Sequence, residues 1–276
     1  MGWHGHLQLD YHRDGDITQA LDRHDGPLRV LQRLYPEGPG ICHHVLVHPP
    51  GGMVGGDTLA IDVTLAEGSH AVLTTPGAAR FYRSSGAAAL QTLTVRAAAG
   101  SRLEWLPLET LAYSGCEGEN RMRFELEPGA QTLGWDVLAL GLPAADQPFE
   151  RGRFTQHIEL PGRWLEHGTI AADDRTLLDS PLGLAGQRVM GTLWLAAGSG
   201  LPDDRREALL EAARTACASH ALARRAGATS PNDALVLLRV LAHRVEPLME
   251  LFKQVRGLWR TQLWGLDARP PRIWTT

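Results

Sequence analysis

The sequence predicts a mainly β protein with two helices in its C-terminal third. Thirty glycines and seventeen prolines in 276 residues indicate many turns and therefore many short strands. Short apolar or alternating runs follow one another through the first two thirds of the chain, with turn residues between them. After Pro202 the apolar residues change to a helical period. Hydrophobic content of 43% with 21% charged residues is ordinary for a globular protein.

The apolar and alternating runs place the strands in order along the chain. The first strand begins at Trp3, where Leu7 and Leu9 share one face because side chains alternate along a strand. The run ICHHVLVH forms the third strand and leads directly into a glycine-rich loop. The predicted strands span residues 3–11, 28–35, 41–48, 58–65, 69–75, 90–96, 101–106, 121–126, 132–140, 154–160, 164–171 and 188–196.

A faint internal repeat indicates that successive strands stack as coils. Gly68, Gly100 and Gly129 are each followed by a small residue, an apolar strand, and then a proline or tryptophan. Their residue numbers differ by 32 (100 − 68) and 29 (129 − 100). A repeat of this length is typical of stacked β-coils, because one coil has no core of its own. The alternative is that a glycine and a small residue simply open many strands.

The C-terminal third is predicted to contain two helices. Residues 203–226 begin at a good cap, Asp203, carry an apolar face, and end before Gly227. The second helix spans residues 246–264, with a proline in its first turn. Between them, residues 234–242 are apolar enough for a helix or a strand. Pro270, Pro271 and their neighbours predict an extended ending over residues 269–274.

Composition excludes several classes of function. A net charge of −4 gives no electrostatic reason for binding nucleic acid or an anionic membrane. Three widely separated cysteines without a CxxC motif fit a reducing compartment. No apolar run reaches the length of a membrane span, and the N-terminus lacks the apolar region of a signal peptide. We therefore expect a cytoplasmic protein.

The common catalytic motifs are missing from the sequence. A phosphate-binding P-loop needs a lysine, and the single lysine, Lys253, falls within a predicted helix. GxSxG and HExxH are also absent. We expect a protein that is not an enzyme, with a hydrolytic β protein as an alternative.

Histidine and cysteine side chains offer two candidate metal sites. Cys42, His44 and His48 share one face of a predicted strand, and Asp57 follows nearby, a donor set that suits nickel or zinc. If Met1 is removed, the new terminal amine, two backbone amides and the imidazole of His4 would suit square-planar nickel or copper. The alternative is that these residues only pack, pair or face water.

Three acidic residues stand in apolar surroundings. Asp57 ends the glycine-rich loop, Asp136 lies within the run LGWDVLAL, and Glu166 lies within WLEHG. Charges in such settings are costly unless they are paired or hydrated. A hydrated channel would satisfy them and give a divalent ion weak, successive stopping points. The alternative is ordinary ion pairing with the abundant arginines.

The most distinctive stretch consists of HPPGGMVGGD and TTPGAARFYRSSG, two loops that flank a strand. The second loop is either an anion or partner site, or a loop that its arginines fix by pairing with internal acids. The residues that we single out in the two loops are Gly51, Gly52, Gly55, Gly56, Arg80, Tyr82 and Arg83.

Together with LEWLP, the Trp135-Asp136 pair and the terminal PRIW, these loops resemble the urease accessory protein family UreD, also called UreH. The likeness covers nearly the whole chain. Two positions depart from the family pattern, where an arginine is replaced by Leu142 and a glutamate by Gln147.

This resemblance implies one domain over residues 1–276, with a β-helix-like fold up to about residue 200, and it favours a strand over residues 234–242. It implies a urease maturation factor that works with UreF and the GTPase UreG. Such a factor holds no tightly bound cofactor and passes Ni²⁺ through an internal tunnel to apo-urease. Asp57, Asp136 and Glu166 match acidic positions of the family pattern. The alternative within the family is a pure adaptor whose interior acids are structural.

Overall fold

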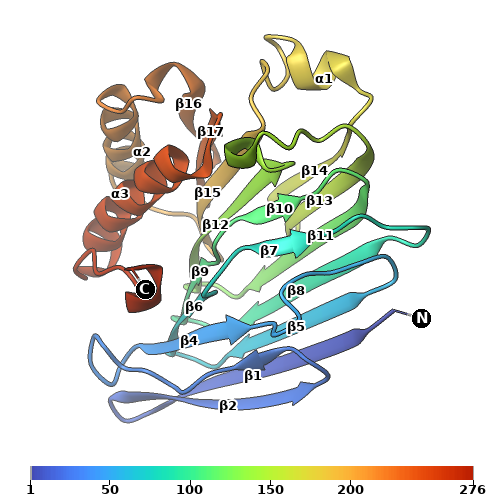
Figure 1. Cartoon of the computed structure of the whole chain (residues 1–276). Helices are drawn as coiled ribbons and strands as arrows, with labels where there is room; N and C mark the ends of the chain where they lie inside the picture. Colours follow the sequence, from blue (N-terminus) through green and yellow to red (C-terminus); the bar gives the residue numbers. More distant parts are fainter. Residues whose placement is uncertain (1, 276) are drawn as a thin grey trace.

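The computed structural model describes residues 2–275 as two stacked β-sheets with the two long helices packed on one side (Figure 1). The strands are β1 (His4–Asp14), β2 (Ile17–Asp25), β3 (Arg29–Val30), β4 (Cys42–Val47), β5 (Thr58–Leu65), β6 (His70–Thr74), β7 (Ala79–Phe81), β8 (Ala89–Ala97), β9 (Arg102–Leu106), β10 (Thr110–Ala112), β11 (Cys116–Leu126), β12 (Gln131–Leu140), β13 (Gly152–Leu160), β14 (Trp164–Ala171), β15 (Val189–Ala197), β16 (Ala226–Asn232) and β17 (Leu235–Ala242). The helices are α1 (Arg175–Asp179), α2 (Asp203–Ala218) and α3 (Val245–Trp264), with short 3₁₀ turns at Pro143–Ala145, Ala223–Arg225 and Arg272–Thr275.

The chain passes back and forth between the two sheets. The first sheet has the order β14-β13-β11-β8-β5-β1-β2, and β1, β5, β8, β11 and β13 run parallel to one another. The second sheet has the order β16-β17-β15-β12-β9-β6-β4-β3, with β7 and β10 beside the end of β12. In this sheet β4, β6, β9 and β12 are parallel. Each return to the same sheet completes one coil, and the coils stack into a β-solenoid-like body.

The glycine repeat marks the turns of these coils. Gly68, Gly100 and Gly129 all adopt positive φ, at 68°, 68° and 83°. Successive turns stack, because the backbone N–H of Gly68 donates to the carbonyl of Ala99 in the next coil. Strand register follows the same spacing, since His70 pairs with Arg102 and Arg102 with Gln131. The predicted stacking of coils is confirmed.

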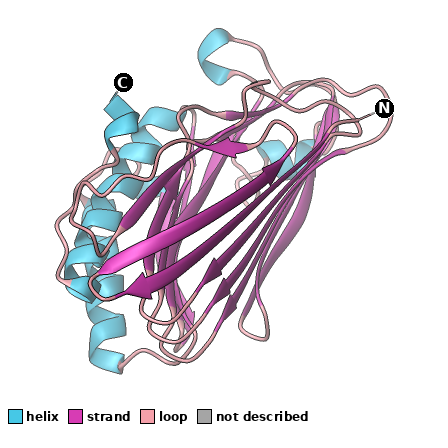
Figure 2. Ribbon diagram, turned by 90° about the horizontal axis from the view of Figure 1, so that it is seen from below, coloured by secondary structure: helices cyan, strands magenta, loops and turns pink. Residues whose placement is uncertain are grey.

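Two apolar cores hold the layers together. The first lies between the sheets and includes Leu9, Val63, Leu93 and Phe154. The second lies between the outer face of the second sheet and helices α2 and α3. Figure 2 shows helices lying along one side of the stacked sheets. Trp135 on β12 is fully buried in this second core. A fully buried side chain of this kind contributes roughly 1.5–3 kcal/mol. Within residues 2–275, no helix is both long and apolar enough to cross a bilayer.

The C-terminal third differs from its prediction in detail. Helix α2 ends at Ala218 and not near residue 226. The Ser219 hydroxyl donates to the carbonyls of Thr215 and Ala216, which closes the last turn. The following residues enter β16, so Gly227 is a strand residue paired with Arg239 rather than a helix cap. Residues 235–242 form strand β17, as the family resemblance favours.

Other strand boundaries also needed the tertiary structure. The prediction for residues 28–35 was too long, because the continuous strand β3 covers Arg29–Val30 at the edge of the second sheet, and Leu34 adds an isolated bridge to His43. Strand β11 begins at Cys116, before the predicted residue 121, because β8 and β13 flank it on both sides. The terminal residues 269–274 are not wholly extended, since Arg272–Thr275 form a 3₁₀ turn. Strands β2, β7, β10 and β16 and helix α1 were not predicted.

Candidate functional site

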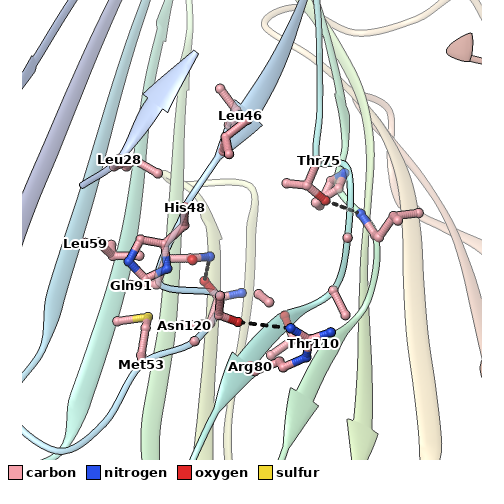
Figure 3. Close-up of a pocket in the computed structure, with 18 of the residues that line it drawn as sticks. Leu28, Leu46, His48, Met53, Leu59, Thr75, Arg80, Gln91, Thr110 and Asn120 are labelled. Carbon is pink, nitrogen blue, oxygen red and sulfur yellow. Dashed lines mark hydrogen bonds between the residues drawn. The ribbon is translucent and has the colours of Figure 1, made fainter. Parts of the chain in front are cut away.

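A cavity of about 270 Å³ opens between the two sheets beside the glycine-rich loop. His48 and Arg80 line its loop side, and Gln91 and Asn120 line it from the first sheet (Figure 3). Asp136 of β12 lines it from the second sheet. Because Trp135 faces the helices, alternation along β12 turns Asp136 toward the space between the sheets. The carboxyl group of Asp136 therefore forms part of the cavity wall deep in the molecule.

Three amide side chains stand opposite Asp136 on the first sheet. Gln91, Asn120 and Gln156 occupy one register position across β8, β11 and β13. Gln91 Nε2 donates to Asn120 Oδ1 at 3.3 Å, and Asn120 Nδ2 donates to Asp136 Oδ1 at 3.0 Å. Gln156 Nε2 donates to Asp136 Oδ2. The two oxygens of one buried carboxyl group are thus held by two different strands.

Asp136 is electrostatically unusual. Burial raises the pKa of its carboxyl group to about 7, and the negative charge of Glu166 adds to the rise. The hydrogen bond from Asn120 opposes both effects because it favours the ionised form. Asp136 therefore changes between acid and carboxylate near neutral pH. A divalent cation would favour the carboxylate.

A second polar group lies between this carboxyl and the edge of the first sheet. Thr192 on β15 lies directly beside Asp136, and its hydroxyl donates to Glu166 Oε1 at 3.0 Å. Arg239 on β17 lies beside Thr192 and contacts Glu166 Oε2 at 2.5 Å. The Glu166 side chain keeps 20% of its surface exposed. The row therefore reaches solvent at strand β14.

We call this row the polar seam. It consists of Gln91, Asn120, Gln156, Asp136, Thr192 and Glu166. Its groups are carboxylates, amides and a hydroxyl, all of which carry oxygen atoms that a hydrated divalent cation accepts. Among residues 2–275, no group of three or more His, Cys, Asp or Glu side chains is arranged to hold a metal ion.

Asp57 lies apart from the seam and braces the glycine-rich loop. Its two carboxylate oxygens accept from the backbone N–H of Trp3 and of Val54, each at 2.8 Å. Burial lowers the pKa of His48, and the charge of Asp57 opposes that effect. Asp57 thus holds the loop through hydrogen bonds with nearby backbone groups. Its role in metal passage stays a prediction.

Cys42 and His44 face the core between the sheets rather than the cavity. Both side chains are fully buried. His44 Nδ1 and the Tyr11 hydroxyl are 2.7 Å apart, while His44 Nε2 has no hydrogen-bond partner. Burial lowers the pKa of His44 to about 4 and raises the pKa of the Cys42 thiol. Because His48 lines the cavity instead, these three predicted ligands do not converge.

The N-terminal metal site also stays a prediction. His4 Nδ1 lies 2.7 Å from the Thr58 hydroxyl, and the Trp3 backbone N–H donates to Asp57. A square-planar site would have to break both contacts. Met1 lies outside the described residues.

The glycines of the first loop allow close packing against the second loop. Gly51 and Gly56 have φ of 77° and 87°, which favours glycine. A Cβ atom on Gly52 would lie 2.2 Å from the ring of Tyr82, and one on Gly55 would lie 2.1 Å from a serine hydroxyl. Substitution at these positions would therefore separate the loops.

The second loop is held by contacts within the chain. The Arg80 guanidinium donates to the carbonyl of Gly51 at 3.4 Å, and the Arg83 side chain packs on Gly115. The Tyr82 and Tyr113 rings have centroids 4.9 Å apart. Through these contacts the second loop supports the first loop and the cavity wall that the two loops form.

The two positions that depart from the family pattern close one loop. Leu142 and Gln147 form an antiparallel bridge, with Leu142 N donating to the Gln147 carbonyl at 2.7 Å. Both contacts use the backbone, so side-chain identity matters little to them.

Sequence reasoning singled out the acids but missed the groups that hold them. Four polar residues that hold the acids did not stand out in the sequence. Asn120 and Gln156 are amides among the otherwise apolar inward positions of β11 and β13, and Thr192 and Arg239 are polar residues within the apolar runs of β15 and β17. An inward position occupied by an amide is the signal that could have found the first two.

The fold and the seam define a β-solenoid-like protein with a polar row through its interior. Comparison with known families makes the class specific. The family model of the UreD urease accessory protein matches residues 4–275. Curated relatives named urease accessory protein UreD include those of Leptothrix cholodnii, 61% identical over 278 residues with full coverage of both chains, and Paracidovorax citrulli, 61% identical over 274 residues with 99% coverage of each. The relative from Variovorax paradoxus is 59% identical over 276 residues. The chain belongs to the UreD urease accessory protein family, whose members are accessory proteins and not catalytic enzymes.

Proposed function

We propose that this protein acts in urease maturation, as a scaffold that works with UreF and the GTPase UreG and passes Ni²⁺ to apo-urease. Family membership over nearly the whole chain supports the maturation role. The relatives' shared name, urease accessory protein, supports urease and its other accessory proteins as partners.

The polar seam is the observation that carries the nickel route. Asp136 and Glu166 are two acidic stops on either side of Thr192, which pairs with Asp136 across the strands and donates to Glu166. Asp136 borders the cavity, and Glu166 reaches solvent. Oxygen donors bind Ni²⁺ more weakly than a set of imidazoles or thiolates does. Weak, successive sites suit a cation that must be released at the end of its path.

A pure adaptor is the second candidate function. The acids of the seam already have partners within the chain, because Gln156 and Asn120 hold Asp136 and Arg239 pairs with Glu166. In that case the seam would be a structural feature of the β-solenoid.

A urease activation assay with purified partners, GTP, bicarbonate and Ni²⁺ separates the two. The test variants are Asp136→Asn and Glu166→Gln, which keep side-chain shape and remove the charge. Asp62→Asn is a matched control, because Asp62 lies on the outer face of the first sheet beside His6. Losing one anionic ligand should slow activation about tenfold or more, equivalent to about 1.4 kcal/mol.

Assembly with UreF and UreG is checked by co-purification in the same preparations. Slow activation by complexes that assemble normally supports the conduit. Normal activation by both test variants would leave the adaptor as the function.

A further inference from the structure

Two histidines face each other on the outer surface of the first sheet. His157 on β13 and His167 on β14 are directly opposite in the antiparallel pairing. Their ring centroids are 5.2 Å apart, with 53° between the ring planes. The neighbours Phe154 and Ile158 are buried in the core, so alternation turns His157 outward. His167 is exposed, and the His157 side chain keeps 23% of its surface accessible.

The charges around this pair are already balanced. Glu159 Oε2 lies 3.6 Å from His157 Nε2 and 2.7 Å from Arg123 Nη1. Arg121, which lies beside His157 on β11, pairs with Glu119 at 2.6 Å. The nearby arginine charges are therefore offset by carboxylates, and one carboxylate borders the imidazoles directly.

We propose that His157 and His167 form a surface site for a divalent transition-metal ion, with Ni²⁺ as the ion relevant to this protein. Imidazole nitrogen is a preferred ligand for nickel, copper and zinc. Metal–nitrogen bonds of about 2.1 Å place two ligating nitrogens roughly 3–4 Å apart, which two rings facing across a strand pair reach by rotating their side chains. Water completes the coordination, because no third ligand of residues 2–275 is arranged for it. Such an open site binds weakly and releases readily.

The position of the pair gives this site a use. His167 directly follows Glu166, and the two side chains emerge on opposite faces of β14. Strand β14 is the last strand of its sheet. Its backbone alone therefore separates His167 on the outer face from Glu166, the solvent-exposed end of the polar seam, on the inner face. A cation held by the pair would therefore sit beside the opening to Glu166. This role as a capture point rests on the proposed function, whereas the binding itself does not.

Equilibrium dialysis of the full chain against Ni²⁺ alone tests the binding. We expect His157→Ala and His167→Ala each to remove one weakly bound equivalent or to weaken it at least tenfold. His12→Ala is the matched control, because His12 is an exposed histidine on β1, near the opposite edge of the same sheet. Circular dichroism confirms that each variant is folded.

Paramagnetic broadening by Ni²⁺ supplies an independent readout. In NMR spectra of the histidine rings, the signals that disappear in the His157→Ala and His167→Ala variants should be among the first that Ni²⁺ broadens in the wild-type chain. Unchanged nickel binding in both variants, or early broadening only of other histidines, would overturn the site.

The failure of this site and of the proposed function give different results. If the pair binds Ni²⁺ but Asp136→Asn activates urease normally, the conduit fails and the surface site stands. If both histidine variants bind Ni²⁺ as the wild-type chain does, the surface site fails whatever the activation assay shows.

Discussion

At the scale of single residues, Asp136 concentrates the chemistry of the interior. It is nearly fully buried, and its oxygens are held by amide side chains from two strands of the facing sheet. Neutral amides donate hydrogen bonds to the carboxyl group but bring no positive charge. An arginine in their place would neutralise it. This leaves Asp136 able to exchange its proton for a cation, which a closed ion pair would prevent.

The raised pKa of Asp136 predicts a pH dependence of stability. Between the unfolded value of about 3.9 and the folded value of about 7, the folded chain keeps a proton that the unfolded chain has lost. The free energy of unfolding therefore falls as the pH rises through this window. Asp136→Asn, which is neutral throughout, lacks this loss. We expect its stability relative to wild type to increase from pH 5 to pH 8, by up to a few kcal/mol.

Urea unfolding at the two pH values measures the difference. Asp16→Asn is the control, because the Asp16 side chain is fully exposed. A wild-type to Asp136→Asn difference that does not change with pH would show that Asp136 is already ionised in the folded chain.

At the scale of elements, helix α3 is joined to the second sheet by buried charges. Glu104 on β9 accepts from Arg256 at 2.6 Å and from Arg260 at 2.8 Å, and its other neighbour, His70, lies 3.2 Å away. Arg260 also pairs with Glu37 at 2.7 Å. Burial opposes ionisation of Glu104, but Arg256, His70 and Arg260 hold its pKa well below the usual range. Two arginines one turn apart on α3 thus bind the same carboxylate, which fixes how the helix is placed along the sheet.

Removing the central carboxylate should release this helix. Glu104→Gln would leave two buried guanidinium groups without their shared partner, and breaking a buried pair in this way costs about 3–5 kcal/mol. We expect a loss of that order in the free energy of unfolding. Chemical denaturation measures it, with Glu125→Gln as a control on the exposed outer face of the first sheet. A loss as small as that of the control would mean that packing alone holds α3.

The elements also show what the sequence could and could not predict. The coil turns were predictable because each uses a glycine with positive φ at a regular spacing. The end of α2 was not, because Ser219 stops the helix through local hydrogen bonds while Arg224 and Gly227 mimic a later ending. The short strands β7 and β10 depend on pairing partners distant in the chain, and periodicity carries no information about partners.

At the scale of the whole molecule, stacking of coils creates the candidate site. Gln91, Asn120 and Gln156 lie far apart in the chain, yet the parallel register of β8, β11 and β13 places them in one row. The sequence identified Asp136 and Glu166 as costly charges. The family resemblance predicted a role for them in nickel passage, which stays a prediction. The sequence could not supply their partners, because these come from the register of one sheet and from its placement over the other.

The central claim is that nickel moves along the polar seam, and direct counting of transferred metal tests it most sharply. Radioactive nickel is loaded onto the complex of this protein with UreF and UreG, and the amount that reaches apo-urease is measured. The comparison is between wild type and the double variant Asp136→Asn/Glu166→Gln in complexes of equal composition. We expect the amount of nickel that the double variant transfers to be lower by about tenfold or more. Equal transfer by the two complexes would contradict the conduit and leave the seam as a structural part of the scaffold.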